Sequence, residues 1–170
     1  MKNGSAKAGY IDFPKYRVPR FAPLSSNTYG WRTCGSASLS VLTGKKARDI
    51  EKSLPKNQVH WSDAAVCKYL RARGFYVRQI TKQSLYNHRK VVKRMTNAYW
   101  INPLEDIVIL ANLAVDEQAS WFVVHNNTIW HNFDRENFSL ASLLSYPSQS
   151  LFLVWKKNWK INNPLTPEFD

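Results

Sequence analysis

Cys34 is the residue whose neighbours best suit it to covalent chemistry. It stands directly before a run of small residues that ends at Gly44, a pattern typical of a short buried helix with a glycine stop. Cys34 would then lie in the first turn of that helix, where unpaired N–H groups and the positive end of the helix dipole favour thiolate over thiol. A cysteine nucleophile needs this placement.

The motif Cys34-Gly35-Ser36-Ala37-Ser38-Leu39 resembles the Cys-Gly-x-Ala-Ser-Leu signature of papain-like cysteine peptidases. It is nearest the bacteriocin-leader (double-glycine) peptidases and their small bacterial and phage relatives. The resemblance covers about residues 27–155 and implies an order of elements: a second helix, a third helix ending in glycine before a strand, and a hairpin with the catalytic histidine and its orienting Asp or Asn. The matching stretches are 47–54, 62–73, 74–77 and 120–124.

The resemblance implies a thiol hydrolase that cleaves a peptide or related amide bond through an acyl-Cys34 intermediate. Two positions depart from the family. Its histidine opens the first hairpin strand, where this chain has Ser120. Its oxyanion glutamine precedes the cysteine; here Thr28 stands at that offset, and Asn27 offers the amide chemistry with a shorter reach, beside the backbone N–H of Cys34.

Two histidines lie close to the replaced position. If Asn126-Asn127 forms a two-residue turn, alternation along the strands places Ser120 and His131 on one face. We therefore predict a relocated pair of Cys34 and His131, in which Ser120 supports the imidazole from across the hairpin. A turn one residue longer or shorter would reverse the faces and favour His125 instead.

Competing interpretations remain for these residues. His131 could be an ordinary sheet histidine, and His60 and His88 are predicted to be surface residues. The whole domain could also be catalytically degenerate, because a fold can keep its architecture after losing its site. Such a domain would act as a structural or virion-associated binding protein, assembling through an aromatic arm at residues 1–25 that includes Tyr10 and Phe21.

The charge is concentrated in one half of the chain. Residues 1–94 carry 20 Lys and Arg against 4 acidic residues, whereas residues 95–170 carry 4 against 8, which gives the net charge of +12. A surface of this sign favours nucleic acid, an anionic envelope or an acidic protein partner, although it also serves simple solubility.

The remaining pattern predicts an α+β fold in which N-terminal helices pack on a C-terminal antiparallel sheet. We divide the chain into an extended arm at 1–25, a papain-like domain at 26–158 and a C-terminal tail at 159–170. Helices are predicted at 45–54, 63–73, 83–95 and 140–144. Strands are predicted at 75–80, 106–113, 121–124, 128–133 and 150–155.

Other chemistries have little support in the sequence. There is no phosphate loop and no Cys-x-x-Cys pair, so we expect no cofactor; a metal held by His125, His131 and Asp134 would need chance geometry. Cys67 falls on the inward side of a helix and is predicted to be a core thiol. Two free thiols and no long apolar run predict a protein without a membrane span, in the cytoplasm or, if phage-encoded, in the host cytoplasm or virion.

Overall fold

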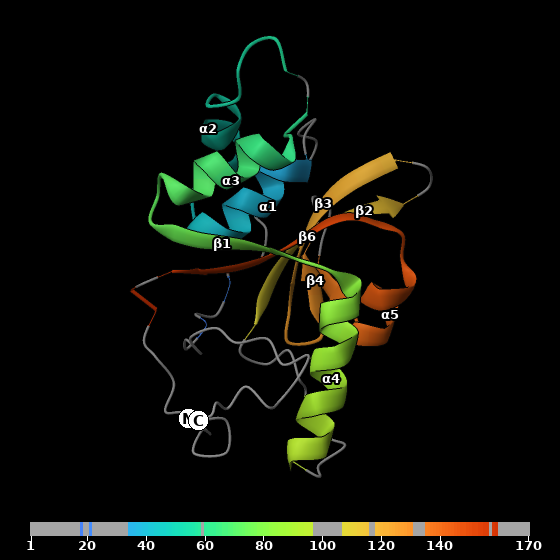
Figure 1. Cartoon of the computed structure of the whole chain (residues 1–170). Helices are drawn as coiled ribbons and strands as arrows, with labels where there is room; N and C mark the ends of the chain where they lie inside the picture. Colours follow the sequence, from blue (N-terminus) through green and yellow to red (C-terminus); the bar gives the residue numbers. More distant parts are fainter. Residues whose placement is uncertain are drawn as a thin grey trace.

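The described residues form an α+β structure, as predicted (Figure 1). In this computed structural model they are residues 18, 21, 34–58, 60–96, 107–115, 118–130, 135–156 and 158–159. The helices are α1 (Cys34–Thr43), α2 (Ala47–Glu51), α3 (Asp63–Arg71), α4 (Lys82–Thr96) and α5 (Leu140–Ser145). The strands are β1 (Phe75–Ile80), β2 (Val108–Val115), β3 (Gln118–His125), β4 (Thr128–Trp130), β5 (Arg135–Asn137) and β6 (Ser148–Lys156).

The strands form one six-stranded sheet in the order β1-β6-β2-β3-β4-β5, and all neighbouring pairs are antiparallel. β2 lies inside the sheet and is buried from Val108 to Leu113. Its nearly continuous apolar sequence therefore reflects burial on both faces, as predicted. The short strand β5 was not predicted, because three polar residues carry no strand pattern.

Helices cover both faces of the sheet (Figure 1). α1 and α3 pack on one face, where Trp121 and Val123 of β3 belong to the first apolar cluster. On the other face, α4 and α5 contribute Leu85 and Leu143 to a second cluster, which includes Val124 of β3. Alternate residues of β3 thus face opposite layers, as the pleat requires.

Several predicted stop and cap signals act as expected. Gly44 and Gly74 follow α1 and α3 with φ values of 73° and 84°, which a residue with a Cβ rarely adopts. The side chain of Ser62 accepts a hydrogen bond from the N–H of Ala65 at 3.1 Å and caps α3. These signals fix where the first helices end and begin.

The hairpin between β3 and β4 has the predicted turn and register. Asn126 and Asn127 have φ values of 47° and 60°, the positive values that a primed two-residue turn needs. His125 pairs with Thr128, and Val123 pairs with Trp130. The register is therefore confirmed as far as Trp130.

Most of the predicted N-terminal arm lies outside the described residues, but Phe21 is buried. Its ring meets those of His125, Trp130 and Trp159 edge to face, with centroids 5.9, 5.5 and 6.4 Å away. At Phe21 the chain therefore packs on the domain. Trp159, the first residue of the predicted tail, belongs to the same cluster, so the core extends to that position.

One histidine prediction was wrong. His88 is 3% exposed, whereas His60 is exposed as predicted. His88 follows Leu85 by three residues on α4, so both side chains lie on the helix face that packs towards the sheet. The basic residues around His88 concealed this spacing in the sequence.

Gly35 allows Trp61 to lie against the start of α1. A Cβ at Gly35 would be 2.7 Å from Trp61 Cδ1 and 2.8 Å from its Cβ and Cγ. Trp61 is buried, and its indole also meets the ring of Tyr69 edge to face at 5.4 Å. The glycine of the Cys-Gly motif thus has a packing role here.

We predict that Gly35→Ala destabilises the fold although alanine is the better helix former. Overpacking against Trp61 costs about 1–3 kcal/mol and outweighs the roughly 0.5–1 kcal/mol that alanine gains in a helix. Urea unfolding of the wild type, G35A, W61L and the double variant measures this. The cost of G35A should shrink in the W61L background; an equal cost in both backgrounds would contradict the contact as its cause.

Candidate thiol site

The Cys34 sulfur lies at the first residue of α1 and contacts β3. α1 begins at Cys34, as predicted, and the side chain is partly exposed. The backbone N–H of Trp121 donates a hydrogen bond to Cys34 Sγ over 3.1 Å. This hydrogen bond fixes the sulfur against the backbone of β3.

Cys34 packs against the first apolar cluster, on the face of the sheet that α1 and α3 cover. Backbone N–H groups of a strand point sideways within the sheet, and Trp121 N–H is directed at Cys34 Sγ. Among the described residues, β4 pairs with β3 at Val123, Val124 and His125.

Two tryptophans fix the helix start to the strand. The indole N–H of Trp121 donates to the carbonyl oxygen of Trp61 at 3.0 Å, and the indole N–H of Trp61 donates to Ser36 Oγ at 2.9 Å. Both indoles are buried, as is Ser36. With the contact to Cys34, these bonds form a closed circuit from α1 through Trp61 to β3 and back, which we call the tryptophan circuit.

Ser120 is adjacent to this contact in the chain. It immediately precedes Trp121 and is half-buried. Its cross-strand partner is Leu113, which belongs to the second cluster, so the Ser120 side chain lies on the opposite face from Trp121. The structure thus brings Cys34 next to the strand position that resembles the family's histidine position, and that position holds a hydroxyl.

His125 does not reach Cys34. It is four residues beyond Trp121 on β3, which is about 13 Å along a strand. Its Nδ1 lies 2.9 Å from the carbonyl oxygen of Ile107, and its ring packs against Phe21. His125 therefore supports the packing of Phe21 rather than the thiol.

The other predicted site residues, His131 and Asn27, lie outside the described residues, as do Thr28 and Asp134. Within the described part, no three His, Cys, Asp or Glu side chains gather as a metal ion would require. None of the helices described has both the length and the apolar character to span a bilayer. The described site therefore consists of Cys34, Ser120 and the tryptophan circuit.

Sequence reasoning missed Trp61 and the role of Ser36. Trp61 immediately precedes the cap residue Ser62, where an apolar residue often packs back on its own helix, but nothing in the sequence showed that it would also reach α1. The sequence presents Ser36 only as one of the small residues after Cys34. Its hydroxyl is in fact the acceptor that holds Trp61.

Comparison of the sequence with models of known protein families and with curated proteins found no match.

We predict that Trp121→Phe destabilises the protein more than Trp130→Phe. Both tryptophans are buried, but Trp121 Nε1 is hydrogen-bonded, whereas Trp130 Nε1 is buried without a partner among the described residues. W121F leaves the carbonyl of Trp61 unsatisfied, which costs about 1–3 kcal/mol. W130F removes a similar area of the buried indole ring but no hydrogen bond.

Denaturant unfolding of both variants measures the difference, because the loss of indole volume largely cancels between them. Equal destabilisation would mean that the tryptophan circuit contributes only apolar contact.

Proposed function

We propose that the chain is a papain-like thiol hydrolase that cleaves a peptide or related amide bond with Cys34 as the nucleophile. The observation that carries the proposal is the position of Cys34 Sγ, at the first residue of α1 and 3.1 Å from the N–H of Trp121 on the hairpin strand. The first turn of a helix is the placement that a cysteine nucleophile needs.

In the proposed reaction, His131 takes the proton of the Cys34 thiol, and the resulting thiolate attacks the carbonyl carbon of the scissile bond and forms a C–S bond. The tetrahedral intermediate then expels the amine, which takes a proton from the histidine, and an acyl-Cys34 thioester remains. Water, deprotonated by the same histidine, attacks the thioester and releases the acid and the thiolate. His131 is the proposed base and acid.

The oxyanion of each intermediate needs hydrogen-bond donors. The backbone N–H of Cys34, in the first turn of α1, is one proposed donor, and the Asn27 side chain is the other. Ser120 is proposed to orient the imidazole, since a hydroxyl can donate or accept one hydrogen bond but cannot serve as a general base near neutral pH. These roles follow the resemblance.

The test is alkylation of the two thiols by iodoacetamide at pH 7, followed by peptide mass spectrometry. Cys34 should react at least tenfold faster than Cys67, because Cys67 is 8% exposed and burial raises the pKa of its thiol. His131→Ala should slow Cys34 by about tenfold or more, since the thiolate loses its positive partner.

His125→Ala is the matched control, because His125 is bonded to Ile107 and lies about four strand residues from the sulfur contact. It should leave the alkylation rate of Cys34 unchanged. Slow Cys34 alkylation that His131→Ala does not alter would reject the hydrolase proposal.

The alternative that we keep is a catalytically degenerate papain-like domain that binds a partner. Two observations favour it: Ser120 stands at the position that resembles the family's histidine position, and His125 is engaged with Ile107. In this case the tryptophan circuit would be retained for stability, and the basic surface would bind the partner.

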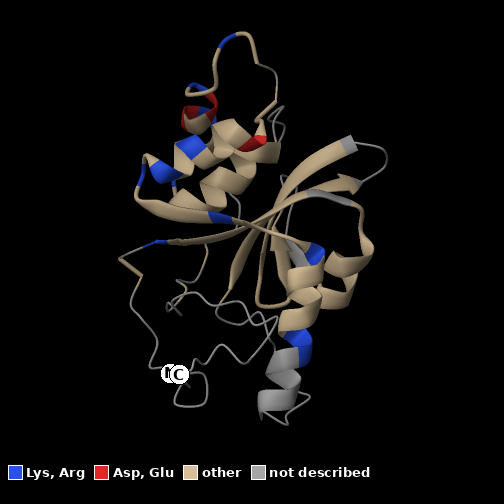
Figure 2. Ribbon diagram, in the orientation of Figure 1, with Lys and Arg blue, Asp and Glu red and all other residues tan. Residues whose placement is uncertain are grey.

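Basic residues spread over α2 and the segments on either side of it, α3, β1 and the described part of α4, whereas acidic ones are few there (Figure 2). The exposed ones are Lys45, Lys46, Arg48, Lys52, Lys56, Lys68, Arg71, Arg78 and Lys90. Figure 2 shows acidic residues mainly on α2 and at the start of α3. This surface would attract a polyanion over a distance of about a Debye length.

If the partner is nucleic acid, affinity should fall with salt in proportion to the phosphates neutralised. For a fluorescent single-stranded oligonucleotide, the logarithm of the binding constant falls linearly with the logarithm of the salt concentration. Each lost phosphate contact reduces the magnitude of this slope by roughly 0.7. Lys46→Gln with Arg48→Gln should therefore reduce the magnitude of the slope by roughly 1.4. Lys156→Gln should not, because Lys156 is half-buried over the Phe75 ring.

Fluorescence anisotropy over 50–300 mM salt measures these slopes. No binding at the lowest salt, or binding that salt does not weaken, would exclude nucleic acid as the partner.

A further inference from the structure

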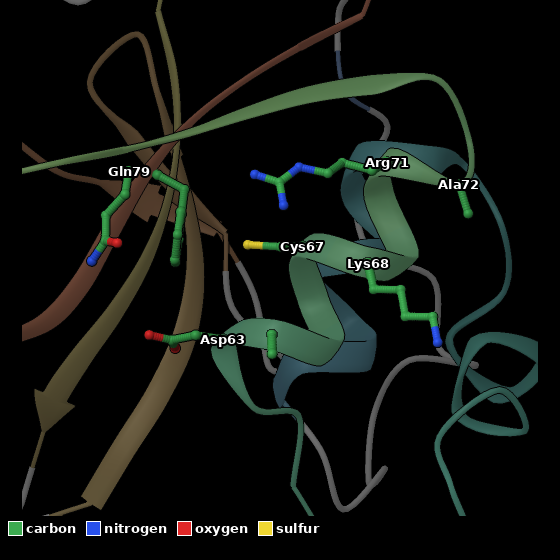
Figure 3. Close-up of a pocket in the computed structure, with 8 residues that line it drawn as sticks. Asp63, Cys67, Lys68, Arg71, Ala72 and Gln79 are labelled. Atoms are coloured by element: carbon green, nitrogen blue, oxygen red, sulfur yellow. The ribbon is translucent and has the colours of Figure 1, made fainter.

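A cleft of about 660 Å³ lies between α3 and strands β1 and β6, apart from the thiol site (Figure 3). Its lining includes Asp63, Cys67 and Arg71 of α3, Gln79 of β1 and Phe152 of β6. The volume is within the range of small-molecule sites. No residue of the proposed reaction lines it.

One side of the cleft is formed by α3 and the residue after it, with lining residues Asp63, Ala64, Cys67, Lys68, Arg71 and Ala72. Asp63, Cys67 and Arg71 recur at intervals of four. Asp63, Cys67 and Arg71 are therefore stacked on one face of the helix, and Figure 3 shows their side chains projecting from the same side of α3 towards the strand that carries Gln79. An acid, a thiol and a guanidinium thus follow one another along the cleft. Asp63 and Arg71 are eight residues apart, which is about 12 Å along the helix axis.

The two charged ends are held in place but not neutralised. Asp63 Oδ1 accepts a hydrogen bond from Ser150 Oγ at 3.0 Å, and Arg71 Nη2 donates to the carbonyl oxygen of Val77 at 3.1 Å. No ion pair joins either of them to another described residue. A carboxylate has further acceptor sites and a guanidinium has five donors, so both can take a ligand without losing these bonds.

The middle of the cleft is apolar. Cys67 and Phe152 are buried there, with 8% and 5% exposed. Burial, the largest effect, raises the pKa of the Cys67 thiol, with a smaller raising effect of Asp63 opposed by Arg71. Cys67 is therefore a neutral thiol that offers an apolar contact. Gln79 is exposed at the cleft and has an amide that can both donate and accept.

We propose that this cleft binds a short peptide of about three residues with both termini free, its amine at Asp63 and its carboxylate at Arg71. A charged amine suits the carboxylate, a carboxylate suits the guanidinium fork, and Gln79 matches a peptide bond. An extended chain covers about 3.3–3.6 Å per residue, so three residues match the rise of about 12 Å between the two positions on α3. Small apolar side chains would contact Cys67 and Phe152.

The site is separate from Cys34 chemistry, so it can be tested in a Cys34→Ala variant that cannot cleave the probe. The probes are trialanine, N-acetyl-trialanine and trialanine amide, measured by calorimetry and by shifts of the Gln79 side-chain amide in ¹H–¹⁵N spectra. We expect trialanine to bind about tenfold more tightly than either blocked form, because each block removes one charged contact.

Two variants assign the termini. In Asp63→Asn, trialanine and N-acetyl-trialanine should bind equally, whereas trialanine amide should still bind more weakly. In Arg71→Gln, trialanine and trialanine amide should bind equally, whereas N-acetyl-trialanine should still bind more weakly. Arg71→Lys keeps the charge and should bind trialanine more tightly than Arg71→Gln does. Arg48→Gln, exposed on α2, is the control and should bind like the parent.

Equal affinity for all three probes, or no saturation up to millimolar trialanine, would overturn the proposal. So would an effect of acetylation that persists in Asp63→Asn. None of these readouts depends on the alkylation of Cys34, so the cleft and the hydrolase proposal can fail independently.

Discussion

The hydrogen bond from the backbone of Trp121 to Cys34 Sγ is the contact on which the rest of the site depends. It joins residues 87 positions apart in the chain and fixes the start of α1 to β3. Side-chain bonds from Trp121 to Trp61 and from Trp61 to Ser36 close the same circuit. Because buried donors and acceptors are costly to leave unpaired, the three bonds favour one position for the helix start, and Gly35 leaves the room that this position needs.

The same arrangement links the thiol to the rest of the sheet. The Trp121 ring stacks on Phe152 of β6, with centroids 6.2 Å apart, and Phe152 lines the cleft beside α3.

Local sequence patterns predicted most of the helices, strands and turns. Gly44, Gly74, Ser62 and the Asn126-Asn127 turn each act within a few residues, so the sequence alone could place them, together with the helix start at Cys34. What it could not reveal depends on contacts between distant segments. Trp61 reaches α1, and His88 turns inward among basic neighbours. The sequence does not show that β1 and β6 lie opposite Asp63, Cys67 and Arg71, so it could not reveal the cleft. The roles of His131 and Asn27 remain predictions from the sequence.

The central claim is that α1 and the hairpin present a thiolate to an imidazole. A crystal structure of the full chain that resolves residue 131 tests it most directly, through the distance from Cys34 Sγ to the nearer ring nitrogen of His131. We predict a separation of about 3–4 Å, close to hydrogen-bond length, while the Trp121 N–H still donates its hydrogen bond to Cys34 Sγ. An imidazole turned away from a sulfur that keeps its contact with Trp121 would contradict the hydrolase and leave the basic binding domain.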